Sequence, residues 1–75
     1  MGKPLALSVL DQSIAIAAAP PSQAIVNSLD LAQHCETLGY KRYWVSEHHN
    51  SDSIVGSAPE VLMAAIAART SHIRI

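Results

Sequence analysis

The sequence has few charges, one cysteine and no long apolar run, and each shortage excludes a class of protein. Charged residues make up 15% of the 75, five basic against six acidic, so no basic patch indicates nucleic acid or an anionic membrane as a partner. The single cysteine, Cys35, cannot form an internal disulfide, so nothing indicates an oxidising compartment, and we expect a cytoplasmic protein. No apolar run approaches the ~18 residues of a membrane-spanning helix.

Glycine is scarce as well, which excludes the common phosphate-binding motifs. The three glycines form neither a dinucleotide-binding fingerprint nor a Walker loop, so we expect no phosphate cradle in this chain. The residues from Leu5 to Leu10 imitate a secretory signal, but Asp11 and Gln12 end the apolar run below the usual length. With 49% apolar residues, the composition is instead that of a folded, globular segment.

The first half of the chain predicts a strand and then a helix. The segment from Leu5 to Leu10 is nearly all apolar, which is typical of a strand covered on both faces. Ser22 is a favourable N-cap for the helix that follows, and Gly39 is a favourable residue to end it. The predicted helix over residues 23–38 has one apolar stripe at helical spacing, formed by Ile25, Leu29, Ala32 and Cys35.

A second strand is predicted directly after Gly39. Tyr43 and Trp44 favour a pleated, half-buried surface, so we predict a strand over residues 41–46 with both aromatic side chains in the core. A third strand is expected to begin at Ile73, after a turn.

A second helix is predicted between these two strands. The segment from Ser57 to Glu60 has the Ser-x-x-Glu pattern of a capping box, with Pro59 in the first turn, where its missing N–H costs nothing. The helix should run to about Thr70. Its unbroken apolar run over residues 61–68 predicts burial on more than one side.

This alternation predicts an α/β fold with the order βαβαβ, in which residues 1–75 form one partial domain. We expect three parallel strands that are adjacent in chain order, with both helices on one face of the sheet. Because the third strand has barely begun at Ile75, we expect the N-terminal portion of a larger parallel protein. The chain by itself should be a marginal monomer, since open strand edges expose unpaired backbone groups.

Polar side chains follow the first strand at Asp11, Gln12 and Ser13. Ligands bind at the carboxyl ends of parallel strands, so these three residues are candidates for contact with a substrate or cofactor. An Asx-type turn that simply ends the strand explains the same residues equally well. Both interpretations remain open from the sequence.

Glu47, His48 and His49 follow the second strand in the same way. Adjacent residues of an extended chain face opposite sides, so one ring can face the ligand end of the sheet while the other packs outward. An imidazole near neutral pH can move a proton, although two solvated loop histidines are the plainer interpretation. A zinc site would need Glu47 and both rings to converge through a bulge. Glu47 can instead orient a neighbouring group by hydrogen bonding.

Four segments together resemble the bacterial-luciferase-like flavin monooxygenases: Leu7 to Ser13, Leu38 to Val45, Glu47 to Asn50 and Ser57 to Leu62. They match the family's first strand, the end of its first helix with the second strand, its Glu-His-His run, and the Ala-Pro-Glu start of its second helix, in that order. The departures are Ile14, where a proline is common, a following loop without its usual glycines, and a much shorter chain.

This resemblance implies a (β/α)8 TIM barrel that is truncated here in its third strand. It implies an enzyme that uses reduced flavin, usually FMN, and O2 to oxidise a small organic substrate; some relatives use a deazaflavin. It assigns the catalytic role to His48. From their positions after the two strands, we expect cofactor or substrate contacts at Asp11, Gln12, Ser13, Glu47 and His49, and no metal. The isolated chain is expected not to bind flavin productively, because most of the family's flavin-phosphate contacts lie outside it.

The resemblance also implies a homo-oligomer that forms through the second helix. The residues expected at that contact are Val61, Ala64, Ala65 and Ala68, of which the alanines would let a partner helix come close. Two other functions remain open from the sequence. One is a non-catalytic remnant or interaction peptide, and the other is a fragment of a metal-dependent barrel hydrolase.

Overall fold

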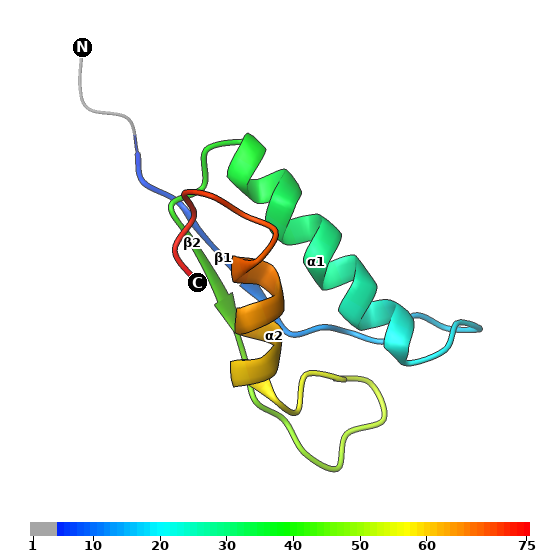
Figure 1. The fold of residues 1–75 in the computed structure, drawn as a ribbon. Helices are drawn as coiled ribbons and strands as arrows, with labels where there is room; N and C mark the ends of the chain where they lie inside the picture. The colour runs from blue at the N-terminus through cyan, green and yellow to red at the C-terminus, as the bar shows by residue number, and fades with distance from the viewer. Residues whose placement is uncertain (1–4) are drawn as a thin grey trace.

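The computed structural model describes residues 5–75 and has the element order β1, α1, β2, α2. Strand β1 spans Ser8–Asp11 and β2 spans Arg42–Val45, and the two pair in parallel (Figure 1). Helix α1 spans Ser22–Thr37 and α2 spans Pro59–Ala67. The predicted α/β class and the parallel pairing of the first two strands are therefore confirmed. The loops that follow the two strands leave from the same end of the sheet.

The core lies between the two helices and one face of the sheet. The predicted stripe of α1 is confirmed, since three of its members are buried and Ile25 is partly buried. Both helices contribute to one cluster with Tyr43 of β2, which confirms that they cover the same face. The buried members of this cluster are Leu29, Ala32, Cys35, Tyr43, Leu62, Ile66 and Ile73.

The opposite face of the sheet corrects two predictions. Strand β1 begins at Ser8 rather than Leu5, and it is not covered on both faces, because Leu10 is exposed. Trp44, which pairs with Leu10, is 59% exposed, so its predicted place in the core was wrong. Alternate side chains of a strand point to opposite faces. Within the described part of the chain, both helices cover the face of Tyr43 and leave the face of Trp44 open.

The predicted third strand is present only as a single bridge. Arg74 forms an isolated parallel bridge with Arg42, so the direction and the neighbour were predicted correctly but a ladder does not form. The N–H of Tyr43 donates to the carbonyl of Arg74 at 2.7 Å, and the N–H of Arg74 donates to the carbonyl of Lys41 at 3.1 Å. This segment therefore extends the sheet beyond β2, on the side away from β1.

The Glu36 carboxylate holds the segment that leads to this bridge. Its Oε2 accepts the backbone N–H groups of Ser71, His72 and Ile73 at 2.7, 2.5 and 3.0 Å. Hydrogen bonds from His72, then Ile73 and Ser71, stabilise the charged form and hold the pKa of Glu36 below its usual range. The last turn of α1 thus fixes where residues 71–73 run.

Both predicted N-caps were wrong. The N-cap position of α1 is Pro21, with helical φ and ψ of −54° and −33°, so Ser22 already lies inside the helix. The proline ring holds φ near the helical value, which lets the helix start one residue earlier. At α2 the N-cap is Ala58 without a side-chain hydrogen bond, so the capping box does not form, whereas Pro59 does occupy the first turn as predicted.

The C-terminal end of α1 was predicted correctly, but that of α2 was not. Gly39 ends α1 as predicted, with φ of 88°, which glycine adopts without strain. The N–H of Gly39 donates to Glu36 and that of Tyr40 to Cys35, both at 3.0 Å, so the last carbonyls of α1 are satisfied. Helix α2 ends at Ala67, short of the predicted Thr70.

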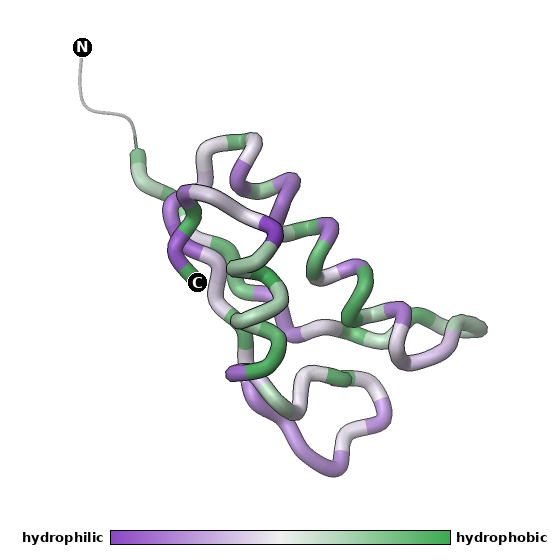
Figure 2. Tube along the Cα trace, in the orientation of Figure 1, coloured by the Kyte–Doolittle hydropathy of each residue, from purple (hydrophilic) through white to green (hydrophobic). Residues whose placement is uncertain are grey.

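Hydropathy differs sharply between the two helices, as Figure 2 shows. Helix α1 alternates between hydrophilic and hydrophobic turns, whereas α2 is mostly hydrophobic. Of the described helices, none combines the length and the apolar character needed to cross a membrane.

Candidate functional site

The two loops at the carboxyl end of the sheet are hydrogen-bonded to each other. The N–H of Ala15 donates to the carbonyl of Ser53 at 2.7 Å, and the N–H of Val55 donates to that of Ser13 at 2.9 Å. Ile14 and Ile54 form an antiparallel bridge between these contacts. The polar residues that follow β1 and β2 are therefore brought together, as the parallel order of the strands predicts.

Gly56 is the buried point at which the loops cross. A Cβ atom at this position would lie 3.3 Å from the carbonyl oxygen of Ser46 and 3.6 Å from that of Gln12. Both neighbours are backbone, so a side chain there would push the strand ends apart. The carbonyl of Gly56 also accepts the N–H of His48 at 2.8 Å. The close approach of Gly56 to the ends of two strands is a tertiary feature, which no local pattern of the sequence indicates.

Asp11 uses both carboxylate oxygens inside the fold. Its Oδ1 accepts the N–H of Ser13 at 2.8 Å, which confirms the Asx-type turn, and its Oδ2 accepts the hydroxyl of Tyr43. Ser13 is 2% exposed, and its Oγ lies 2.7 Å from the Oγ of Ser28 on α1. Strand end, helix and second strand thus share one buried polar network.

The surroundings of this network favour the neutral forms of Tyr43 and Cys35. Burial, followed by the hydrogen bond to Asp11, raises the pKa of Tyr43 far above its usual value. Burial and the charge of Asp11 also raise the pKa of the Cys35 thiol. Tyr43 is therefore a neutral donor to Asp11, and Cys35 packs in the core as a neutral side chain.

Ser13 stands in a left-handed backbone conformation, with φ of 54°. For a residue with a Cβ this conformation costs roughly 1–2 kcal/mol. Three contacts offset that cost: its N–H bonds Asp11, its carbonyl accepts from Val55, and its hydroxyl meets Ser28. Gln12, between Asp11 and Ser13, is half-buried with its carbonyl near Gly56, and its role in binding stays a prediction.

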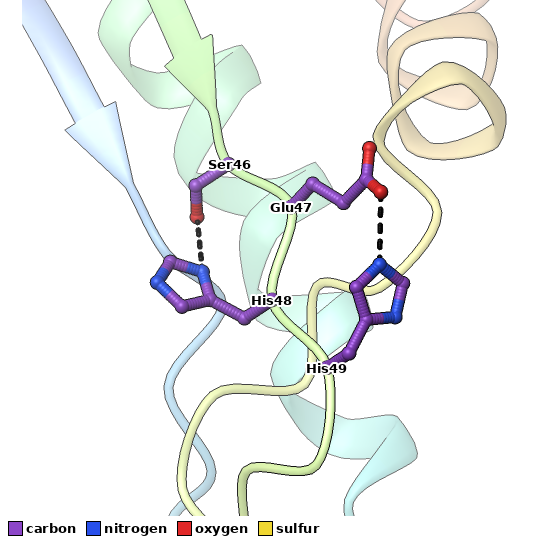
Figure 3. A network of polar contacts seen from close by, with 4 residues as sticks. All are labelled: Ser46, Glu47, His48 and His49. Atoms are coloured by element: carbon purple, nitrogen blue, oxygen red, sulfur yellow. Dashed lines mark hydrogen bonds and ion pairs between the residues drawn. The ribbon is translucent and has the colours of Figure 1, made fainter.

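The polar groups after β2 separate to two sides of the chain (Figure 3). The rings of His48 and His49 point in opposite directions, as predicted for adjacent residues. Nδ1 of His48 lies 3.2 Å from the hydroxyl of Ser46. Nε2 of His49 lies 2.8 Å from the carboxylate of Glu47, so Glu47 does bond a neighbouring ring, and both of these side chains are mostly exposed.

This divergence removes the geometry that a zinc site would need. Glu47 and His49 lie on one side of the loop, and His48 lies on the other. Within residues 5–75, no three histidine, cysteine, aspartate or glutamate side chains lie close enough together to hold one metal ion.

His48 is the group at this edge best placed for chemistry on a ligand. Its ring is half-buried, its backbone is held by Gly56, and its Nδ1 is held by Ser46. No group of the described chain hydrogen-bonds its Nε2, which leaves that nitrogen available to give or take a proton. By contrast, Asp11 and Ser13 already have partners within the fold.

Comparison with known proteins gives one consistent family. Residues 7–75 match the family described as luciferase-like monooxygenase. The chain is 49% identical over 71 residues to the uncharacterized protein YwcH of Bacillus subtilis. The match covers 95% of this chain and 21% of that protein. It is 48% identical over 69 residues to N-acetyl-S-alkylcysteine monooxygenase of the same organism, covering 92% of this chain and 21% of the enzyme.

A solved structure has the same fold over this region. The crystal structure of apo-MsnO8 superposes with a TM-score of 0.91 at 41% identity, over 95% of this chain and 22% of that one. The chain therefore spans about a fifth of the length of the relatives that it matches.

Proposed function

Because the chain belongs to the luciferase-like monooxygenase family, we propose that it forms the His48 edge of a site in which an organic substrate is oxidised with reduced flavin and O2. The observation that carries the proposal is the half-buried ring of His48 at the carboxyl end of two parallel strands, with Nδ1 held and Nε2 available. Ligands of parallel α/β proteins bind at this end.

The residues present fit one edge of a flavin site. Leu10 and Trp44 give an exposed apolar surface on the open face of the sheet, and His48 and Gln12 give polar groups beyond the strand ends. Flat apolar rings with a polar rim bind to such combinations. When bound, reduced FMN would supply the electrons for the reduction of O2; a deazaflavin is the alternative. Most of the flavin contacts would come from outside these 75 residues.

His48 would move protons for this reaction at Nε2. A monooxygenase places one atom of O2 in its substrate and releases the other as water, which requires protons to be delivered and removed. A neutral or charged imidazole can do either near neutral pH. Asp11 and Ser13 would hold the loop in place, and Glu47 and His49 would contact solvent or substrate at the rim.

We further propose that α2 pairs with a second copy. Val61 is 65% exposed and Met63 is 38% exposed, within a stretch of the helix that is apolar from Val61 to Ala67. A groove of about 320 Å³ lies between the helices, and Val61 and Ala65 line it together with Ile25. Ala64 and Ala68 are also exposed, so small side chains would let a partner helix approach closely.

The function can be tested in a chimera that supplies the rest of the enzyme. This chain would replace the matching segment of N-acetyl-S-alkylcysteine monooxygenase, to which it is 48% identical. We expect the chimera to consume O2 with reduced FMN and to form oxidised product. His48→Ala should slow the oxidation about 100-fold, the lower end of what general acid–base catalysis contributes.

Two controls accompany this variant. His34→Ala should retain the activity, because His34 is an exposed residue of α1, and both variants should melt at the temperature of the parent. Unchanged turnover of His48→Ala would refute the proposed role. Titration of the 75-residue chain alone with reduced FMN should show no micromolar binding, and sedimentation should show oligomers rather than a sharp monomer.

A further inference from the structure

A serine that the sequence analysis did not single out contacts the ring of His48. Ser46 lies directly after β2, and its Oγ is 3.2 Å from Nδ1 of His48. We propose that Ser46 is a positioning residue that holds this ring in one orientation while proton exchange takes place at Nε2. The catalytic part of this inference depends on the proposed function, but the pairing of Ser46 with His48 does not.

Gly56 fixes the backbone of both partners. The carbonyl of Ser46 packs against Gly56, and the N–H of His48 donates to the carbonyl of Gly56 at 2.8 Å. Glu47, between them, points to the other side and bonds His49 (Figure 3). The side chains of Ser46 and His48 therefore meet on a backbone that Gly56 contacts at both residues.

A hydroxyl suits this position because it both donates and accepts hydrogen bonds. When His48 is charged, Nδ1–H donates to the Ser46 oxygen. In the neutral tautomer with the proton on Nδ1, Nδ1–H keeps the same bond. In the neutral tautomer with the proton on Nε2, the hydroxyl rotates and donates to Nδ1. The contact is thus present in every protonation state of the ring. A carboxylate there would instead favour the charged ring.

Both partners are half-buried, so the bond competes only partly with water. The pair of Glu47 and His49 provides an internal comparison, because both of its side chains are more than half exposed. We therefore expect the orientation of His48 to depend on Ser46, and that of His49 to be insensitive to it.

The decisive experiment is a double-mutant cycle in the chimera. Ser46→Ala should lower the oxidation rate about tenfold, which corresponds to the loss of one hydrogen bond. Ser46→Thr keeps the hydroxyl and should restore most of the rate. In a His48→Ala background, Ser46→Ala should have no further effect. Ser57→Ala, an exposed serine before α2, is the matched control and should leave the rate unchanged.

Side-chain NMR tests the pairing without any turnover. In the chimera labelled at histidine, Ser46→Ala should average the χ1 coupling of His48 over several rotamers, while His49 keeps its parent value. An unchanged His48 coupling, or an equal effect of Ser46→Ala with and without His48, would overturn the proposal. If His48→Ala itself leaves the rate unchanged while the NMR effect is present, the proposed function fails and the pairing stands.

Discussion

Strands β1 and β2 are each followed by a short run of polar residues at the same edge of the sheet. The run after β1 is bonded inside the fold, whereas most of the run after β2 is exposed. After β1, Asp11 and Ser13 are bonded to Tyr43 and Ser28 inside the fold. After β2, Glu47 and His49 face solvent and His48 keeps one ring nitrogen free of the described chain. Position at the ligand end of a sheet is therefore not sufficient for a reactive role.

The difference follows from what lies behind each strand end. Helix α1 returns over the end of β1 and brings Ser28 to Ser13, and Tyr43 reaches Asp11 from the same covered face. Among the backbone hydrogen bonds of residues 5–75, the segment after β2 is held by the returning loop, through Gly56. Polar groups under a helix must be satisfied internally, whereas those at an uncovered loop can bond to water or a ligand.

The largest effect is expected where the internal network is broken. Asp11→Ala removes the acceptor of the Tyr43 hydroxyl and of the Ser13 N–H, and each bond to a charged group contributes about 1.5–3 kcal/mol. We expect the free energy of unfolding to fall by about 3 kcal/mol, enough to remove the helical circular dichroism of a marginal chain. Asp30→Ala, on the exposed face of α1, is the control. Equal urea midpoints for the two variants would contradict the comparison.

Alkaline pH should weaken the same network without a mutation. Because the folded chain raises the pKa of Tyr43, the folded state keeps a proton that the unfolded state loses above about pH 10. Stability from this group is fully present below that pH, and it should fall above it by up to about 1.4 kcal/mol per pH unit. Tyr43→Phe should remove the part of this slope that begins near pH 10 in urea titrations at several pH values, and the part that comes from the raised pKa of Cys35 should remain. If Tyr40→Phe removed this part of the slope and Tyr43→Phe did not, the prediction for Tyr43 would be wrong.

The smallest effect is expected at the end of β2. Glu47→Ala removes the partner of His49, but both side chains are mostly exposed, and such pairs contribute about 0–1 kcal/mol. We expect the free energy of unfolding to change by less than about 0.5 kcal/mol, at low and at high salt. A loss as large as that of Asp11→Ala would show that the two strand ends are equally structural.

The sequence by itself determined the features that depend on neighbouring residues. The order of the first four elements, the end of α1 at Gly39 and the opposite directions of His48 and His49 were predicted correctly. The Asx-type turn at Asp11 was one of two interpretations that the sequence left open. Each of these follows from helical or strand periodicity, or from a bond between residues close in the chain. Such signals are complete within a few positions of the sequence.

The tertiary structure alone decided which polar and aromatic groups are covered. Tyr43 and Trp44 have similar preferences for strands, yet one is 1% and the other 59% exposed, because both helices pack on one face. The bond between Asp11 and Tyr43 and the bonds from Glu36 to residues 71–73 join positions far apart in the chain. No local pattern encodes such contacts, because they arise only when separate elements pack together.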